Sequence, residues 1–167
     1  VLDETGEAIR KSGRPVTNET VLAALKYSFL KNRIGGNLIY DPAESVSLEG
    51  NSGPYLQYAH ARAKSILAKA GAKNLASQNL PLEPDERSLA RRVGEYSEVI
   101  ELATDELIPH YICTYLYELA QEFNHFYEKN RVIGDPRESV RLALVNSYAD
   151  KLKSGLALLG ISAPEKM

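Results

Sequence analysis

The sequence has no tryptophan, a single cysteine, a single methionine and no long apolar run. Because Cys113 is alone, no disulfide can form within the chain, which fits a reducing compartment such as the cytoplasm. No apolar stretch approaches the roughly 20 residues that span a bilayer. The first residues show neither the basic leader nor the apolar core of a signal peptide. Since no initiator methionine is present either, we expect a fragment of a larger protein.

Acidic residues are missing from one long stretch of the chain. Residues 50–82 contain no Asp or Glu and carry four basic side chains, whereas residues 83–130 carry eleven acidic and four basic ones. A polyanion would be attracted to the first segment and repelled by the second, although the whole chain has a net charge of only −2. The alternative is that solvated helix faces simply differ in sign.

Apolar residues recur at helical spacing along most of the 167 residues, a length that suits about one domain. We therefore predict an all-α helical bundle with at most one very short extended segment near residues 38–40. One uninterrupted helix is expected over 85–107 with most of its acidic residues outward, and 71–84 is the best linker candidate. The two Asp-Pro-x-Glu sequences, 41–44 and 135–138, predict helix starts. Before them, a helix capped by Thr17 or Asn18 should bury Val21, Leu22, Leu25, Phe29 and Leu30.

The helix that begins near Gly53 has a distinctive first half. Ser52 can cap it, Pro54 suits its first turn, and Tyr55 belongs to its apolar stripe. Tyr58 lies off that stripe, with Arg62 one turn later. An aromatic ring can stack on an unpaired base, and a guanidinium can bind phosphate, so the pair indicates RNA binding. The alternative is a tyrosine packed at the rim of the bundle under an arginine.

No combination of residues predicts catalysis or a metal site. Glu122 and His125 have the spacing used in di-iron bundles, but a second such pair and two further glutamates are missing. His110 and Cys113 likewise have no second pair to complete a tetrahedral site. The apolar neighbours of Cys113 favour a place in the core over a nucleophile. We expect no catalytic residue and no metal ligand.

Several segments resemble one protein family, in order along the chain. Residues 50–62, Gly-Asn-Ser-Gly-Pro-Tyr-Leu-Gln-Tyr-Ala-His-Ala-Arg, resemble the start of the anticodon-binding domain of arginyl-tRNA synthetases, and further similarities cover 115–127, 141–145, 155–161 and 164–167. The resemblance implies a C-terminal, all-helical, DALR-type anticodon-binding domain of a class Ia synthetase. It also implies that Tyr58, Arg62 and Met167 lie against anticodon bases.

The resemblance further implies that this is the anticodon-binding fragment of an arginine–tRNA ligase. Residues 1–49 would link to the catalytic domain, and residues 50–167 would bind the anticodon. The partners would then be tRNA-Arg and the catalytic domain of the same chain, with no membrane and no DNA. The ATP signatures of such enzymes are absent, so the fragment alone should be inactive and hold no cofactor, while ATP and Mg²⁺ would serve the parent enzyme.

Phosphate attraction is expected from lysines of the basic stretch and the end of the chain. The candidates are Lys64, Lys69 and Lys166, the last at a position where the family more often has Arg. Lys keeps the charge but loses the planar fork of Arg. The alternative function is a helical protein–protein interaction module without RNA binding, with the acidic helix at 85–107 as its contact face.

Overall fold

The computed structural model describes residues 1–36, 38–71 and 80–167. Within these ranges every regular element is an α-helix, which confirms the predicted all-α class. The described helices are α1 Leu2–Lys11, α2 Asn18–Leu30, α3 Pro42–Ser45, α4 Gly53–Ala70, α5 Pro84–Gly94, α6 Tyr96–Asp105, α7 His110–Lys129 and α8 Glu138–Leu158. The predicted extended segment, 38–40, lies in neither a helix nor a strand. Residues 72–79 of the predicted linker lie outside the described residues.

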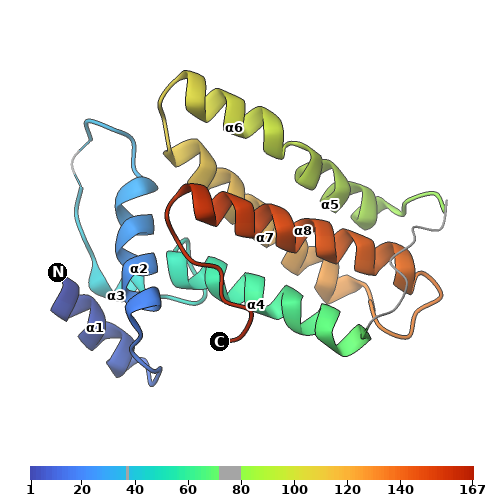
Figure 1. Cartoon of the computed structure of the whole chain (residues 1–167), viewed down its shortest axis with the longest axis horizontal. Coiled ribbons are helices and arrows are strands. Elements are labelled where there is room, and N and C mark those ends of the chain that lie inside the picture. Colours follow the sequence, from blue (N-terminus) through green and yellow to red (C-terminus); the bar gives the residue numbers. More distant parts are fainter. Residues whose placement is uncertain (37, 72–79) are drawn as a thin grey trace.

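The pair α7 and α8 forms the middle of three helical layers (Figure 1). Helix α4 packs on one side of this pair, and α5 and α6 cover the other side. Helices α1, α2 and α3 gather at the N-terminal end of α4, where α2 contacts it directly. After α8 the chain turns back and runs along α4 to residue 167 (Figure 1). The acidic α5–α6 layer is thus separated from the basic α4 by the central pair.

Two apolar cores hold this arrangement together. The larger core joins the layers through fully buried side chains that include Leu56, Leu89, Leu116, Phe123, Tyr148 and Leu152. The smaller core lies among α1, α2 and the residue after α3, and consists of Ile9, Val21, Ala24, Leu25 and Val46. Helix α2 contributes to both cores. The division of the chain near residue 49 stays a prediction.

The start of α4 lies unusually close to α2. A Cβ on Gly53 would stand 2.2 Å from the backbone oxygen of Ala23, so only glycine fits this crossing. The side-chain oxygen of Ser52 accepts a hydrogen bond from the backbone N–H of Tyr55, as its predicted capping role requires. The helix ends at Gly71, whose φ of +70° favours glycine. Both ends of α4 were therefore predicted correctly.

The expectation of one helix over 85–107 was wrong. Helix α5 ends at Gly94, Glu95 forms a turn, and α6 runs only to Asp105. Glycine is a poor helix former and a common site of sharp bends, which explains a break that apolar periodicity alone does not reveal. Beyond α6, Leu107 has a φ of +56°, a left-handed conformation that ends the helical path.

Two further expectations need correction. The second Asp-Pro-x-Glu sequence does not begin a helix at Pro136: Asp135 instead accepts a hydrogen bond from the backbone N–H of Arg137 in a turn, and α8 starts at Glu138. The same carboxylate also pairs with Arg141 at 3.2 Å, which draws it away from a capping position. On α2, Leu22 and Phe29 are exposed rather than buried. That helix buries the alanine and Tyr27 side instead, because α4 approaches it closely there.

Candidate functional site

Helix α4 buries nearly all of its first half: from Gly53 to Ala61, Tyr58 is the one exposed residue. Tyr55 is buried, and its hydroxyl accepts a hydrogen bond from Asn124 on α7 at 2.9 Å. Tyr58 leaves 43% of its surface exposed, far more than a packed tyrosine. Tyr55 therefore anchors the helix, as predicted, and Tyr58 presents an aromatic ring to solvent. This exposure favours the binding interpretation of Tyr58 over the packed-rim alternative.

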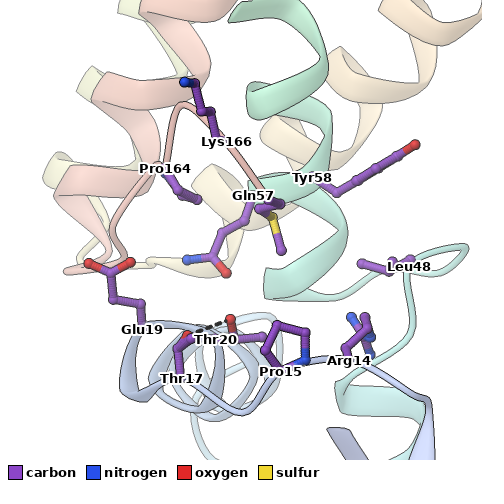
Figure 2. A pocket seen from close by; sticks show the side chains of 11 residues that line it. Arg14, Pro15, Thr17, Glu19, Thr20, Leu48, Gln57, Tyr58, Pro164 and Lys166 are labelled. Carbon is purple, nitrogen blue, oxygen red and sulfur yellow. Dashed lines mark hydrogen bonds between the residues drawn. The ribbon is translucent and has the colours of Figure 1, made fainter. Parts of the chain in front are cut away.

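Tyr58 lines a cavity of about 410 Å³ where several separate chain segments meet (Figure 2). The volume lies within the range of small-molecule sites in proteins. Its walls come from the loop before α2, the first turn of α2, the loop between α3 and α4, α4 itself and the end of the chain. The lining residues are Arg14, Pro15, Thr17, Glu19, Thr20, Leu48, Gln57, Tyr58, Pro164, Lys166 and Met167. Three residues singled out in the sequence for nucleic-acid contact, Tyr58, Lys166 and Met167, thus meet at one cavity.

The other sequence-predicted contact residue, Arg62, is not among the residues that line this cavity. Its guanidinium lies over the ring of Tyr127 on α7, with Cζ 4.9 Å from the ring centroid. This cation–π contact holds the guanidinium of Arg62 against α7. Tyr58 and Arg62, one helical turn apart, are thus two potential contact residues on α4, and their binding of a nucleic acid stays a prediction.

The three lysine candidates have different surroundings. Lys166 lines the cavity. Lys64 forms an ion pair with Glu165 at 3.7 Å, so part of its charge is already compensated. Lys69 is exposed in the last turn of α4. Of the three, Lys166 and Lys69 are better placed than Lys64 to attract a phosphate.

Sequence reasoning missed two polar residues of α4, Gln57 and His60, each only 1% exposed. The Gln57 amide nitrogen donates to the carbonyl oxygen of Ser162 at 2.9 Å. His60 Nδ1 lies 2.8 Å from the carbonyl oxygen of Pro164. Burial lowers the pKa of His60, so the neutral imidazole is favoured. Helical periodicity assigns polar residues to the surface, and only the folded tail reveals their partners.

The residues considered for metal binding or nucleophilic chemistry do not assemble into such a site. No group of three or more His, Cys, Asp or Glu residues with metal-binding geometry occurs within 1–36, 38–71 and 80–167. Cys113 is buried, as predicted, and burial raises the pKa of its thiol to about 12. A thiol with so high a pKa is almost entirely protonated at neutral pH and is a poor nucleophile.

A family model with the description "DALR anticodon binding domain" matches residues 56–167, well over half of the chain. The chain belongs to the DALR anticodon-binding domain family. The match begins at Leu56, inside α4, and includes Tyr58, Arg62 and Met167. It therefore covers the α4 and tail walls of the cavity, whereas Arg14 and Leu48 come from the preceding residues.

Relatives of this DALR-family chain are named as arginine–tRNA ligases. The protein of Geobacter metallireducens is 42% identical over 165 residues, and that of Limosilactobacillus fermentum is 40% identical over 154 residues. The chain spans 29% and 27% of their lengths, respectively.

Solved structures agree with these relatives. The Thermus thermophilus arginyl-tRNA synthetase superposes with a TM-score of 0.89 at 34% identity, over 99% of this chain and 31% of that one. The Plasmodium falciparum arginyl-tRNA synthetase, at 23% identity and a TM-score of 0.86, shows the shared fold. No helix in the described part of the chain is long and apolar enough to cross a membrane.

Proposed function

We propose that the chain is the anticodon-binding part of an arginine–tRNA ligase and that it docks the anticodon stem-loop of tRNA-Arg. The observation that carries the proposal is the cavity in which an exposed tyrosine, Tyr58, meets Met167 and Lys166. One wall offers an aromatic face, another a flexible, polarizable thioether, and a cation stands at the rim. This is the chemistry that takes up a splayed base next to its phosphate.

The charge distribution also favours RNA binding on the side of the bundle where the cavity lies. The α4 side of the bundle is acid-free in sequence over 50–82, while the acidic α5–α6 layer lies beyond α7 and α8 (Figure 1). The RNA backbone is attracted to the first surface and repelled by the second. Arg62, held over Tyr127, supplies a second contact beside the cavity, for a base or a phosphate.

The wider activity follows from the relatives, of which this chain spans less than a third. We infer that a catalytic domain elsewhere in the parent protein uses ATP and Mg²⁺ to attach arginine to the tRNA, in the cytoplasm. The present chain positions the tRNA and holds no cofactor of its own. The family match does not favour the alternative, a protein–protein module whose acidic helices form the contact face.

The test is a titration of the chain with labelled tRNA-Arg and with a non-cognate tRNA at several salt concentrations. We expect tighter binding of tRNA-Arg and an affinity that falls as salt rises, because each neutralised phosphate releases counterions. A folded chain that binds neither tRNA at low salt would contradict independent anticodon binding. Binding of both tRNAs with equal affinity would reduce the function to unspecific RNA attraction.

A further inference from the structure

The end of the chain lies along α4, fixed by contacts at its backbone. Gly160, with a φ of +67°, turns the chain after α8, and its carbonyl oxygen accepts a hydrogen bond from Lys26 on α2. Ile161 is then buried in the main core. From Ser162 onward no helix shapes the chain, so its path depends on the side chains that hold it.

Gln57, His60 and Lys64 hold the segment in sequence order. Their spacing of three and four residues puts the three side chains on one face of α4, directly beneath the tail. Gln57 binds the Ser162 carbonyl oxygen at 2.9 Å, His60 contacts that of Pro164 at 2.8 Å, and Lys64 pairs with Glu165 at 3.7 Å. The contacts end immediately before Lys166 and Met167, which line the cavity together with Pro164.

The contact of His60 fixes the state of its ring. A carbonyl oxygen only accepts, so Nδ1 must donate, and the neutral ring then carries its lone pair on Nε2. That Nε2 is buried and has no hydrogen-bond partner in the described structure, and neither has the side-chain oxygen of Gln57. An unsatisfied buried polar atom is costly. An apolar side chain would fill either place without that cost, so simple packing explains these two residues poorly.

We propose that Gln57 and His60 are positioning residues: they fix the backbone of residues 162–164 so that Met167 lines the same cavity as Tyr58. The inference rests on the proposed function, because the cavity matters only if a base enters it. Figure 2 shows this arrangement: Gln57 lies between the tail and the start of α2, and Tyr58 is the next residue of the same helix. His60 is not among the residues that line the cavity, so its effect on RNA binding must act through the tail, whereas Gln57 lines the cavity as well.

The first readout needs no RNA. Met167 is the only methionine of the chain, so its labelled methyl group gives a single, assignable NMR signal. In the unmodified chain we expect this signal displaced from that of an unstructured methionine, and the displacement reduced by Tyr58→Leu. In His60→Phe, which keeps the ring volume but removes the donor, the signal should move to the unstructured position. A signal unchanged by His60→Phe would overturn the positioning role.

The second readout is the affinity for the anticodon stem-loop of tRNA-Arg. Loss of one base contact, worth ~1–3 kcal/mol, corresponds to a roughly 5- to 150-fold weaker affinity. We expect His60→Phe and Met167→Ala to weaken binding by similar factors within this range, and the double variant to be no weaker than either single one. Residues that act through one another are non-additive, whereas independent effects multiply. Multiplied losses in the double variant would overturn the proposal.

Two further variants separate positioning from general destabilisation. Gln57→Glu has the same shape, but its carboxylate cannot donate to the Ser162 carbonyl. If His60→Phe fails to fold, Gln57→Glu should still move the Met167 methyl signal to the unstructured position, a readout that the new charge in the cavity wall does not confound. Ser28→Ala is the control: Ser28 is a buried polar residue whose hydroxyl donates to the Leu25 carbonyl of its own helix. It should change neither the methyl signal nor the affinity. If the unmodified chain binds no RNA, the proposed function fails, while the methyl signal still decides whether His60 and Gln57 hold the tail.

Discussion

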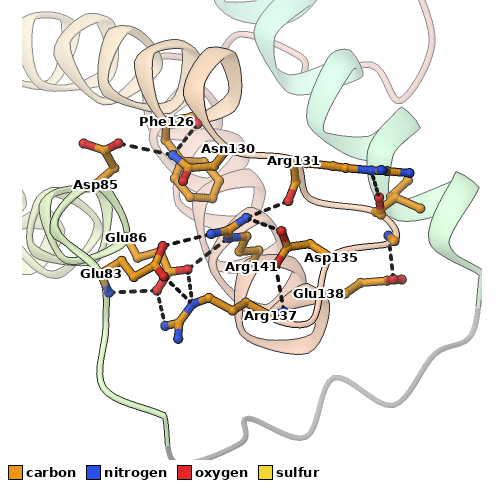
Figure 3. Close-up of polar contacts among 12 residues, drawn as sticks. Glu83, Asp85, Glu86, Phe126, Asn130, Arg131, Asp135, Arg137, Glu138 and Arg141 are labelled. Atoms are coloured by element: carbon orange, nitrogen blue, oxygen red, sulfur yellow. Dashed lines mark hydrogen bonds and ion pairs between the residues drawn. The ribbon is translucent and has the colours of Figure 1, made fainter.

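The side chains of Glu86 and Arg141 form an ion pair inside the bundle, with 3.0 Å between Arg141 Nε and Glu86 Oε1. Glu86 is 0% exposed, and its other oxygen pairs with Arg137 at 2.5 Å (Figure 3). Glu83 joins the same cluster through its 3.0 Å contact with Arg141. These contacts tie the start of α5 to the start of α8.

This cluster predicts a loss of stability in acid. Burial by itself raises the pKa of the Glu86 carboxyl, but hydrogen bonds from Arg137, the Glu83 backbone and Arg141 outweigh it and lower the pKa to about 2. A carboxyl whose pKa is lowered in the folded state contributes its full stabilisation when the pH is above its ordinary pKa of 4.5. This contribution is lost as the pH falls toward 2, the pKa in the folded state. The free energy of unfolding in urea should therefore decline between about pH 5 and pH 2.

The variant Glu86→Gln tests the origin of this decline. At pH 7 it should destabilise the chain by ~3–5 kcal/mol, because two arginines lose their buried partner, and its stability should vary less with pH. Glu98→Gln, on the exposed part of α6, should keep the pH profile of the unmodified chain. If the free energy of unfolding of Glu86→Gln falls with pH as steeply as that of the unmodified chain, the acid sensitivity comes from other carboxylates.

The sequence predicted contacts made within a helix better than contacts made between distant segments. The Ser52 cap, the glycine end of α4 and the contrast between Tyr55 and Tyr58 follow from local spacing, and all three are confirmed. Most acidic residues of 85–107 were expected to face outward, and Glu86 is an exception, because it is buried. Its partners Arg137 and Arg141 lie about 50 residues away in sequence, and only the packing of α5 on α8 brings them together.

The same limit explains which site residues were missed. Tyr58 and Met167 were identified because the resemblance names their positions, while Gln57 and His60 gave no signal as polar residues between apolar ones. Their partners are backbone carbonyls of an irregular tail, which leave no trace in residue type. A cavity wall contributed by Arg14 and Leu48 was equally invisible, since it arises from loops that meet only in the folded chain.

Two glycines with different surroundings, Gly53 at the crossing of α2 and α4 and Gly94 at the end of α5, predict opposite effects of substitution by alanine. Gly53→Ala would place a methyl group 2.2 Å from the Ala23 backbone oxygen, so α2 must shift. We expect a destabilisation of at least ~1–3 kcal/mol from overpacking. Gly94→Ala adds a methyl group with nothing within 4 Å and should stabilise the chain by ~0.5–1 kcal/mol through helix propensity. Denaturant unfolding of both variants measures the difference, and equal effects would contradict the crossing geometry.

The basic end of α4 predicts a change in the salt dependence of RNA binding. If Lys69 neutralises one phosphate, the negative slope of log affinity against log salt should become shallower by about 0.7–0.9 in Lys69→Ala. The control Lys11→Ala removes the same charge from the last turn of α1, away from α4, and should leave the slope almost unchanged. Both slopes come from titrations with tRNA-Arg at several salt concentrations. Equal reductions in the two variants would mean that only the net charge of the chain matters.

The exposed ring of Tyr58 predicts a loss of binding without a loss of stability. Tyr58→Ala should weaken the affinity for the anticodon stem-loop by ~1–3 kcal/mol, the usual contribution of stacking one base on an aromatic side chain. Because 43% of the residue is exposed, thermal stability should change little. Tyr111→Ala, at the start of α7, removes a partly exposed tyrosine that hydrogen-bonds Glu106 and should leave RNA affinity unchanged. A large drop in the melting temperature of Tyr58→Ala with unaltered RNA affinity would instead assign Tyr58 to the packing of the bundle rim.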